Sequence, residues 1–172
     1  MDEVLLLIKN RAIFLDRDGV INRNRDDYVK NTQEMEILPN VSDAIKLLNE
    51  KNFLVVIISN QSAINRGLLS VETLDEIHQF LKKEVAKKGA KIDAIYFCPH
   101  RPDENCGCRK PQPAMILRAS EDLEINLLKS YMIGDRDSDR ICAQRANVKF
   151  IQMKTDDNLL HLVRIFLDKH GN

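Results

Sequence analysis

A short apolar run that leads into two aspartates most constrains what this chain can fold into. In the segment AIFLDRDGVIN, residues 12–22, Asp16 directly follows four apolar residues, Asp18 comes two positions later, and Gly19 allows a sharp turn. A run this short and this apolar leaves no room for a polar face, which is typical of a strand buried in a parallel sheet. Ligands of open parallel sheets bind beyond the carboxyl ends of the strands, so we expect Asp16 and Asp18 at a ligand site.

Two carboxylates this close in the chain repel each other unless a cation lies between them or one of them keeps a proton. With Mg²⁺ bound, the first carboxylate could attack phosphorus while the second carries a proton. The alternative is an ordinary Asp-rich loop, and the buried strand and Gly19 argue against that alternative.

Length and charge narrow the class of protein. A chain of 172 residues is expected to form one domain, residues 1–172. Its 26 basic and 26 acidic residues cancel, which argues against an extended nucleic-acid-binding surface. The N-terminal apolar run, residues 4–8, is too short for a signal peptide or a membrane span. We therefore expect a cytoplasmic monomer that has no nucleic-acid or membrane partner.

Apolar runs alternate with amphipathic stretches along the chain, which predicts strands that alternate with helices. We expect strands over residues 12–16, 53–58, 92–97, 131–134 and 148–153. We expect helices over residues 41–51, 71–88, from Pro111 or Pro113 to about residue 123, 138–147 and 157–169. The fold class is therefore α/β, a doubly wound, mostly parallel sheet with helices on both faces and no large cap domain.

Polar residues follow the apolar runs at several points. Ser59, Asn60, Gln61 and Ser62 follow the second strand, and Asp135 and Arg136 follow the fourth. The pair Arg109 and Lys110 follows a cysteine-containing loop. The carboxyl ends of parallel strands face one side of the sheet, so these residues are expected to converge on one crevice.

The loop at residues 98–109 carries a predicted metal site. Cys98, His100, Cys106 and Cys108 supply three thiolates and an imidazole, a set that suits a closed tetrahedral Zn²⁺ site. A closed site leaves no position for water, so we expect a structural ion that fixes the loop and, with it, Arg109 and Lys110. The alternative is a reduced loop with unpaired thiols. Cys142 is predicted to be a small core residue.

Four motifs occur in order: DRDGV at 16–20, SNQ at 59–61, RKP at 109–111 and GDRDSD at 134–139. Together they resemble the haloacid dehalogenase (HAD) superfamily of phosphotransferases over about residues 12–153. The stretches FLDRDGVIN, SNQSAINRG and CPHRPDENCGCRKP are more specifically similar to the group of D,D-heptose 1,7-bisphosphate phosphatases and histidinol phosphatases.

This resemblance implies roles for named residues. Asp16 would be the nucleophile and form an aspartyl-phosphate, and Asp18 would be the general acid and base. Ser59 would donate a hydrogen bond to the phosphoryl group, and Lys110 would offset its charge. The carboxylates of Asp16 and Asp135, with the backbone carbonyl of Asp18, would hold a catalytic Mg²⁺.

The resemblance also points to a small phosphorylated substrate, in particular a sugar bisphosphate. We expect substrate-binding residues in two segments and at two separate arginines: Arg25, Asp26, Asp27 and Tyr28; Asn60, Gln61 and Ser62; Arg109 and Arg136. Arg109 and Arg136 could bind a second phosphate. Two alternatives stay open, a histidinol-phosphate phosphatase and a non-catalytic zinc-stabilised binding module.

Overall fold

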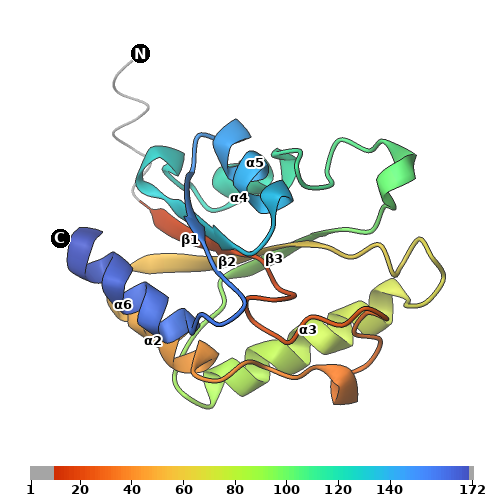
Figure 1. The fold of residues 1–172 in the computed structure, drawn as a ribbon, viewed down its shortest axis with the longest axis horizontal. Helices are drawn as coiled ribbons and strands as arrows, with labels where there is room; N and C mark the ends of the chain where they lie inside the picture. The colour runs from red at the N-terminus through yellow and green to blue at the C-terminus, as the bar shows by residue number, and fades with distance from the viewer. Residues whose placement is uncertain (1–9, 171–172) are drawn as a thin grey trace.

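A five-stranded sheet forms the centre of the computed structural model, which describes residues 10–170 (Figure 1). The strand order is β3-β2-β1-β4-β5, and each neighbouring pair is parallel. The strands are β1 (Arg11–Leu15), β2 (Phe53–Asn60), β3 (Ala94–Cys98), β4 (Tyr131–Gly134) and β5 (Lys149–Gln152). The predicted parallel α/β architecture is confirmed.

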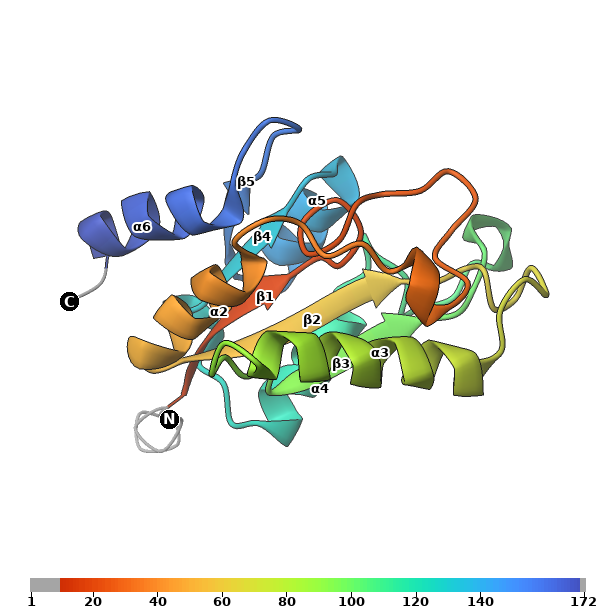
Figure 2. The ribbon, with the colours of Figure 1, turned by 90° about the horizontal axis from the view of Figure 1, so that it is seen from below.

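Helices cover both faces of this sheet (Figures 1 and 2). One face carries α2 (Val41–Glu50), α3 (Val71–Ala86) and α6 (Leu159–His170). The other face carries α4 (Ala114–Asp122) and α5 (Asp137–Arg145). Each predicted helix is present, and its ends lie within three residues of the predicted ones.

The pleat of the strands explains why two separate cores form. Ile13 and Leu15 of β1 belong to the core under α2, α3 and α6, whereas Ala12 and Phe14 belong to the core under α4 and α5. Successive side chains of a strand point to opposite faces, so a strand buried on both faces must be apolar throughout. Cys142 of α5 lies in the second core, as predicted.

Local signals in the sequence set several helix ends. Ser70 caps α3, because its side chain accepts a hydrogen bond from the amide of Thr73 at 3.1 Å. β3 begins at Ala94, two residues later than expected, and Asp93 precedes it with its carboxylate bonded to the amide of Val55 at 2.8 Å. Three short 3₁₀ helices, which the apolar pattern did not predict, lie at Thr32–Glu34, Pro102–Glu104 and Leu127–Lys129.

In the part of the chain that the structure describes, no separate domain is inserted into the connections that follow the strands. Residues 16–40 link β1 to α2 and contain one 3₁₀ helix, and residues 61–70 link β2 to α3. Among the described helices, none has the length and apolar character needed to cross a membrane. Residues 4–8, whose apolar run was noted above, lie outside the described residues.

The register brings the strand ends together. Leu15, the last residue of β1, lies opposite Ile57 of β2 and Ile133 of β4. The amide of Asp16 continues this pattern with a 3.1 Å hydrogen bond to the carbonyl of Ile133. Asp16 therefore leaves the sheet between the ends of its two neighbouring strands.

We predict that Leu74→Ala lowers the free energy of unfolding by about 2–5 kcal/mol, because the fully buried Leu74 packs α3 onto the sheet. Urea unfolding followed by circular dichroism measures this loss. Leu68→Ala is the matched control, since Leu68 is 50% exposed and its truncation should change stability by no more than about 0.5 kcal/mol. Equal losses in the two variants would contradict this account of the core.

Candidate active site

A cavity of about 330 Å³ opens at the carboxyl ends of the strands. Ten of the residues predicted from sequence line it: Asp16, Asp18, Arg25, Asp26, Tyr28, Asn60, Ser62, Arg109, Lys110 and Arg136. Asn24, Ser138 and Asp139 line it as well and were not predicted. Residues as far apart in the chain as Asp16 and Asp139 thus meet in one crevice, as the parallel topology requires.

The ammonium group of Lys110 is the buried centre of this crevice. Its Nζ lies 2.8 Å from Asp16 Oδ1 and 2.7 Å from Asp139 Oδ1, and it donates a 2.8 Å hydrogen bond to the carbonyl of Ile58. Burial opposes the charged form, but the carboxylates of Asp16 and Asp139 raise the pKa of Lys110 above its ordinary value. The lysine is therefore a fixed positive charge beside Asp16.

The backbone of Lys110 is held separately from its side chain. Asn60, the last residue of β2, donates from Nδ2 to the Lys110 carbonyl at 3.1 Å and accepts from the Lys110 amide at 3.0 Å. Both polar ends of the Asn60 side chain are therefore used on Lys110. The sequence predicted a substrate contact for Asn60, and the structure gives its side chain this backbone contact.

Three carboxylates cluster around the lysine. One oxygen from each of Asp16, Asp135 and Asp139 lies within 4.8 Å of the other two. Burial raises the pKa of Asp16 to about 6, with Lys110 lowering it and the carboxylates of Asp139 and Asp18 adding to the rise. Burial likewise raises the pKa of Asp135, whose Oδ1 is buried and has no hydrogen-bond partner.

This cluster suits a hard divalent cation. Carboxylate oxygens are the ligands that Mg²⁺ prefers, and an unpartnered buried carboxylate oxygen is a natural ligand atom. The sequence placed Asp16, Asp18 and Asp135 around the ion. Asp16 and Asp135, which were expected to bind through their carboxylates, join the carboxylate cluster, and Asp139 is its third member. Asp18 was expected to bind through its backbone carbonyl, and that contact stays a prediction.

Asp139 is the functional residue that the sequence reasoning missed. Its side chain is fully buried, and its Oδ2 accepts a 3.2 Å hydrogen bond from the amide of Arg136. A Cβ at Gly134 would lie 2.5 Å from the Cβ of Asp139, so the close approach requires glycine there. The signal was present as the last residue of GDRDSD at 134–139.

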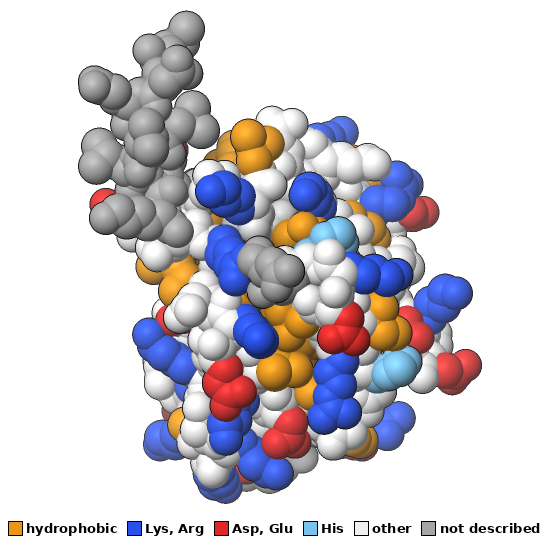
Figure 3. Space-filling view, turned by 90° about the vertical axis from the view of Figure 1, so that its left-hand side faces the viewer, with side chains coloured by type: hydrophobic (Ala, Val, Ile, Leu, Met, Phe, Trp, Pro, Cys, Tyr) orange, Lys and Arg blue, Asp and Glu red, His pale blue; other side chains and the backbone are white. Residues whose placement is uncertain are grey.

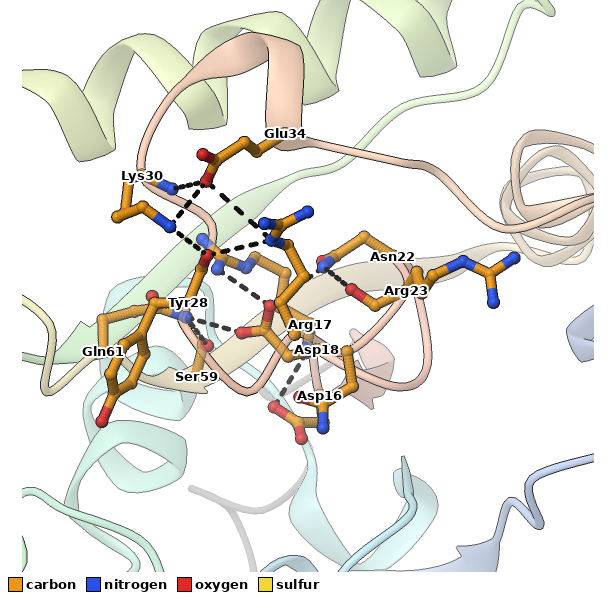
Figure 4. Close-up of polar contacts among 12 residues, drawn as sticks. Asp16, Arg17, Asp18, Asn22, Arg23, Tyr28, Lys30, Glu34, Ser59 and Gln61 are labelled. Atoms are coloured by element: carbon orange, nitrogen blue, oxygen red, sulfur yellow. Dashed lines mark hydrogen bonds and ion pairs between the residues drawn. The ribbon is translucent and has the colours of Figure 1, made fainter.

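The carboxylate of Asp18 turns to a separate set of donors (Figure 4). Its Oδ1 accepts from Arg17 Nη2 at 3.0 Å and from Asn22 Nδ2 at 2.9 Å, and its Oδ2 accepts from Gln61 Nε2 at 2.8 Å. Burial would raise the pKa of Asp18, but the charge and hydrogen bond of Arg17, with those of Asn22 and Gln61, hold it below its ordinary value.

Arg17 is itself 1% exposed, and its ion pair with Asp18 is its one salt bridge to the residues described. A buried charge without a partner is strongly destabilising, so Asp18 also stabilises the fold around Arg17.

Ser59 and Gln61 lie just below the cavity. Both are buried, with exposed fractions of 1% and 2%, and neither lines the cavity. Gln61 Nε2 donates a 2.6 Å hydrogen bond to Ser59 Oγ in addition to its bond to Asp18. A substrate contact was predicted for Gln61, and in the structure its side chain contacts two other site residues.

Ion pairs within residues 25–34 hold together the segment that follows the first motif. Arg25 Nε donates to Asp27 Oδ1 at 3.0 Å, and Lys30 Nζ donates to Asp27 Oδ2 at 2.7 Å and lies 3.1 Å from Glu34 Oε2. The positive charge of Arg25 is thus already paired. The pairing explains why Asp27, predicted as a substrate contact, does not line the cavity.

The side chains of two arginines at the cavity form no hydrogen bond to a carboxylate among residues 10–170. Arg109 Nη1 donates to the carbonyl of His100 at 2.9 Å. Arg136 Nη2 donates to Asn24 Oδ1 at 3.2 Å, and its Nε lies 3.9 Å from Asp135 Oδ1. Their charges remain available for an anionic ligand.

The predicted zinc ligands converge. One ligand atom from each of Cys98, His100, Cys106 and Cys108 lies within 4.8 Å of the other three, and the cysteines form no disulfide. The Sγ atom of Cys98 lies 3.0 Å from that of Cys108 and 3.5 Å from that of Cys106. This Cys₃His set fits a closed structural Zn²⁺ site two residues before Lys110.

A second hollow, of about 340 Å³, lies beside α6 on the face that Figure 3 shows. Tyr131 and Lys149, the first residues of β4 and β5, line it together with apolar side chains such as Phe150 and Ile165. It is therefore at the amino end of the strands, opposite Asp16. None of its lining residues is a carboxylate, so it offers no counterpart of the carboxylate cluster in the first cavity.

Comparisons with known proteins agree with this geometry. Residues 107–163 match a family described as HAD-hydrolase-like. The chain is 39% identical over 145 residues to D-glycero-beta-D-manno-heptose-1,7-bisphosphate 7-phosphatase of Helicobacter pylori strain J99, covering 84% of this chain and 83% of that protein. It is 40% identical over 144 residues to the protein of that name from Yersinia pestis, covering 80% and 76%.

A solved structure is similar over nearly the whole chain. The crystal structure of D,D-heptose 1,7-bisphosphate phosphatase from B. bronchiseptica, complexed with magnesium and phosphate, superposes with a TM-score of 0.86 at 30% identity and covers 92% of this chain and 99% of that one. The Burkholderia thailandensis enzyme of that name gives a TM-score of 0.66 at 25% identity, covering 92% and 99%. The chain belongs to the D,D-heptose 1,7-bisphosphate phosphatase family of HAD-like hydrolases.

Proposed function

We propose that this protein is a Mg²⁺-dependent phosphatase that removes the 7-phosphate of D-glycero-β-D-manno-heptose 1,7-bisphosphate. The observation that carries the proposal is the buried Lys110 ammonium between the carboxylates of Asp16 and Asp139. Phosphoryl transfer needs positioning and charge compensation, and this arrangement supplies both at a carboxylate nucleophile. The identity of the substrate is inferred from the names of relatives that are similar to this chain over most of its length.

The reaction follows from the roles of the side chains. A carboxylate oxygen of Asp16 attacks phosphorus, the bond from phosphorus to the sugar oxygen breaks, and Asp18 gives that oxygen its proton. Water then attacks the aspartyl-phosphate and passes a proton to Asp18, which releases inorganic phosphate and restores Asp16. Lys110 offsets the negative charge in both steps, and the hydroxyl of Ser59 donates to a phosphoryl oxygen.

Two metal ions fit the residues present. Asp16, Asp135 and Asp139 are the carboxylates grouped to hold Mg²⁺, which supplies charge neutralisation at the phosphoryl group when it is bound. The Cys₃His set would hold Zn²⁺, which fixes the loop that precedes Lys110.

A kinetic comparison of substrates tests the proposal. Phosphate release from the heptose bisphosphate should require Mg²⁺ and should exceed release from histidinol phosphate at equal concentration. Asp16→Asn should abolish turnover, because an amide cannot form the aspartyl-phosphate, while circular dichroism shows the same fold. Substantial turnover by pure Asp16→Asn protein would exclude Asp16 as the nucleophile, and faster hydrolysis of histidinol phosphate would reassign the substrate.

The close approach of Gly19 to Asp135 allows a test of the Mg²⁺ ligands. In Gly19→Ala the new Cβ would lie 2.9 Å from Asp135 Cγ and closer to its Oδ2, so Asp135 must move. Gly89→Ala is the control, because Gly89 also has a positive φ, +75° against +93°, but has no atom within 4 Å of the new Cβ. Both variants should lose about 1–2 kcal/mol of stability.

Only Gly19→Ala should raise the Mg²⁺ concentration needed for half-maximal activity. A magnesium titration of the initial rate measures this concentration in both variants. An unchanged value in Gly19→Ala would remove Asp135 from the proposed set of ligands.

The metal content of the purified protein tests the zinc site. We expect about one zinc ion per chain by elemental analysis, and we expect Cys106→Ser to lose zinc and activity together, because the loop that precedes Lys110 loses its shape. Cys142→Ala is the control, since Cys142 lies in α5 and is not one of the four clustered ligands. Folded, active wild-type protein free of zinc would contradict the structural role.

Arg109 and Lys110 should differ in their effect on substrates. Lys110→Ala should lower kcat for every phosphate ester, because the ammonium contacts Asp16. Arg109→Ala should reduce kcat/KM for the bisphosphate by about 10- to 150-fold, the effect of losing one charge-assisted hydrogen bond, and should affect a small monoester less.

The exposed Arg118 of α4 provides the control, and Arg118→Ala should leave both values unchanged. Equal losses on the two substrates would mean that Arg109 orders the loop through its bond to His100 rather than binding a second phosphate.

A further inference from the structure

The side chain of Gln61 joins two groups that the proposed mechanism uses separately. Its Nε2 lies 2.6 Å from Ser59 Oγ and 2.8 Å from Asp18 Oδ2, and Figure 4 shows it between these two residues. Gln61 is 2% exposed and does not line the cavity. Both hydrogens of the Gln61 NH₂ group are used on Asp18 and Ser59, so these donors act on the reaction through those two residues.

Donor and acceptor chemistry fixes the direction of both hydrogen bonds. An ionised carboxylate only accepts, so the amide of Gln61 must present its NH₂ group and not its oxygen to Asp18. The second hydrogen of the same NH₂ group then points to Ser59 Oγ, which acts as the acceptor. With this bond accepted, the hydroxyl hydrogen of Ser59 is left to donate elsewhere. Among the described residues, Ser59 Oγ has no other side-chain or backbone partner.

The two oxygens of Asp18 depend on different donors. Arg17 and Asn22 both bond to Oδ1, whereas Gln61 is the one donor to Oδ2 among residues 10–170. Without Gln61 the carboxylate is held at one oxygen only and can rotate about its terminal bond. Small misplacement of a catalytic group has a large effect on rate.

The backbone of Gln61 is held independently of its side chain. Its amide donates a 2.7 Å hydrogen bond to the carbonyl of Cys98, the last residue of β3. A change of the side chain therefore leaves the main-chain support of this turn in place.

We infer that Gln61 is a positioning residue that orients the Ser59 hydroxyl toward the phosphoryl group and fixes the free oxygen of Asp18 at the same time. The inference rests on the proposed function, since both partners act on the phosphoryl group or its leaving oxygen. It replaces the substrate contact expected for Gln61 from sequence. If Gln61 only contacted the substrate, or only stabilised the fold, the effects of substitutions at Gln61 and Ser59 on kcat would be independent of each other.

A double-mutant cycle tests this dependence. The variants are Gln61→Met, Ser59→Ala and the double mutant, each measured for kcat and KM on the heptose bisphosphate and on 4-nitrophenyl phosphate with saturating Mg²⁺. Gln61→Met keeps the length of the side chain and removes both donors, and it should lower kcat by about 10- to 100-fold. KM should stay within about twofold, because a group that does not touch substrate contributes little to ground-state binding.

The effect should shrink when Ser59 is absent. In the Ser59→Ala background, Gln61→Met should reduce kcat by a factor at least about threefold smaller than in the wild type, because the part that acts through the hydroxyl is gone. Gln61→Glu serves as a second probe of similar volume, since a carboxyl group has at most one hydrogen to donate and cannot serve both acceptors. Gln79→Met, on the exposed side of α3, is the matched control and should retain wild-type kinetics.

Three outcomes would overturn the inference. A higher KM with unchanged kcat would make Gln61 a substrate contact, equal reductions in both backgrounds would mean that it does not act through Ser59, and wild-type kinetics of Gln61→Met and Gln61→Glu would leave it no role. The two substrates separate this result from the proposed function. An enzyme that hydrolyses 4-nitrophenyl phosphate but not the heptose bisphosphate refutes the proposed substrate and still allows the double-mutant cycle to be measured. An enzyme that hydrolyses neither compound refutes both proposals.

Discussion

The buried ammonium group of Lys110 is the interaction on which the rest of the site depends. It lies within 3 Å of Asp16, Asp139 and the carbonyl of Ile58, and it is 3% exposed. Two carboxylates at this depth would repel each other and raise each other's pKa without a cation between them. The positive charge of the lysine therefore allows several carboxylates to lie close together in the crevice. Mg²⁺, when bound near Asp135, would neutralise the remaining negative charge.

The surrounding fold is arranged to keep that lysine in place. Asn60 bonds to its backbone from the end of β2, and the Cys₃His cluster lies two residues before it in the loop. A loop of this length whose regular structure is one short 3₁₀ helix needs such fixed points, because its own backbone forms few regular hydrogen bonds. Zinc and catalysis are linked by the chain itself, since the loop that the ion fixes ends at Lys110.

The sequence predicted most of the fold because its apolar runs are short, continuous and separated by amphipathic helices. It predicted the crevice because parallel topology forces Asp16, Lys110 and Asp135 to the same edge of the sheet. It could not assign Asp139, which lies one helical turn beyond Asp135 and reads from sequence as a helix-start carboxylate. The sequence also could not show that Ser62 lines the cavity whereas the neighbouring Gln61 is buried beneath it, because the path of the backbone in this turn decides where each side chain points.

The two carboxylates that we propose to be catalytic have pKa shifts of opposite sign, and the proposed roles need ligands to reverse both. Burial raises the pKa of Asp16 to about 6, although a nucleophile must be ionised, and Arg17 holds the pKa of Asp18 low, although an acid must carry a proton. A divalent cation among Asp16, Asp135 and Asp139 favours the ionised form of Asp16. A phosphate group beside Asp18 adds negative charge and raises its pKa. Binding of metal and substrate together thus produces the protonation states that hydrolysis requires.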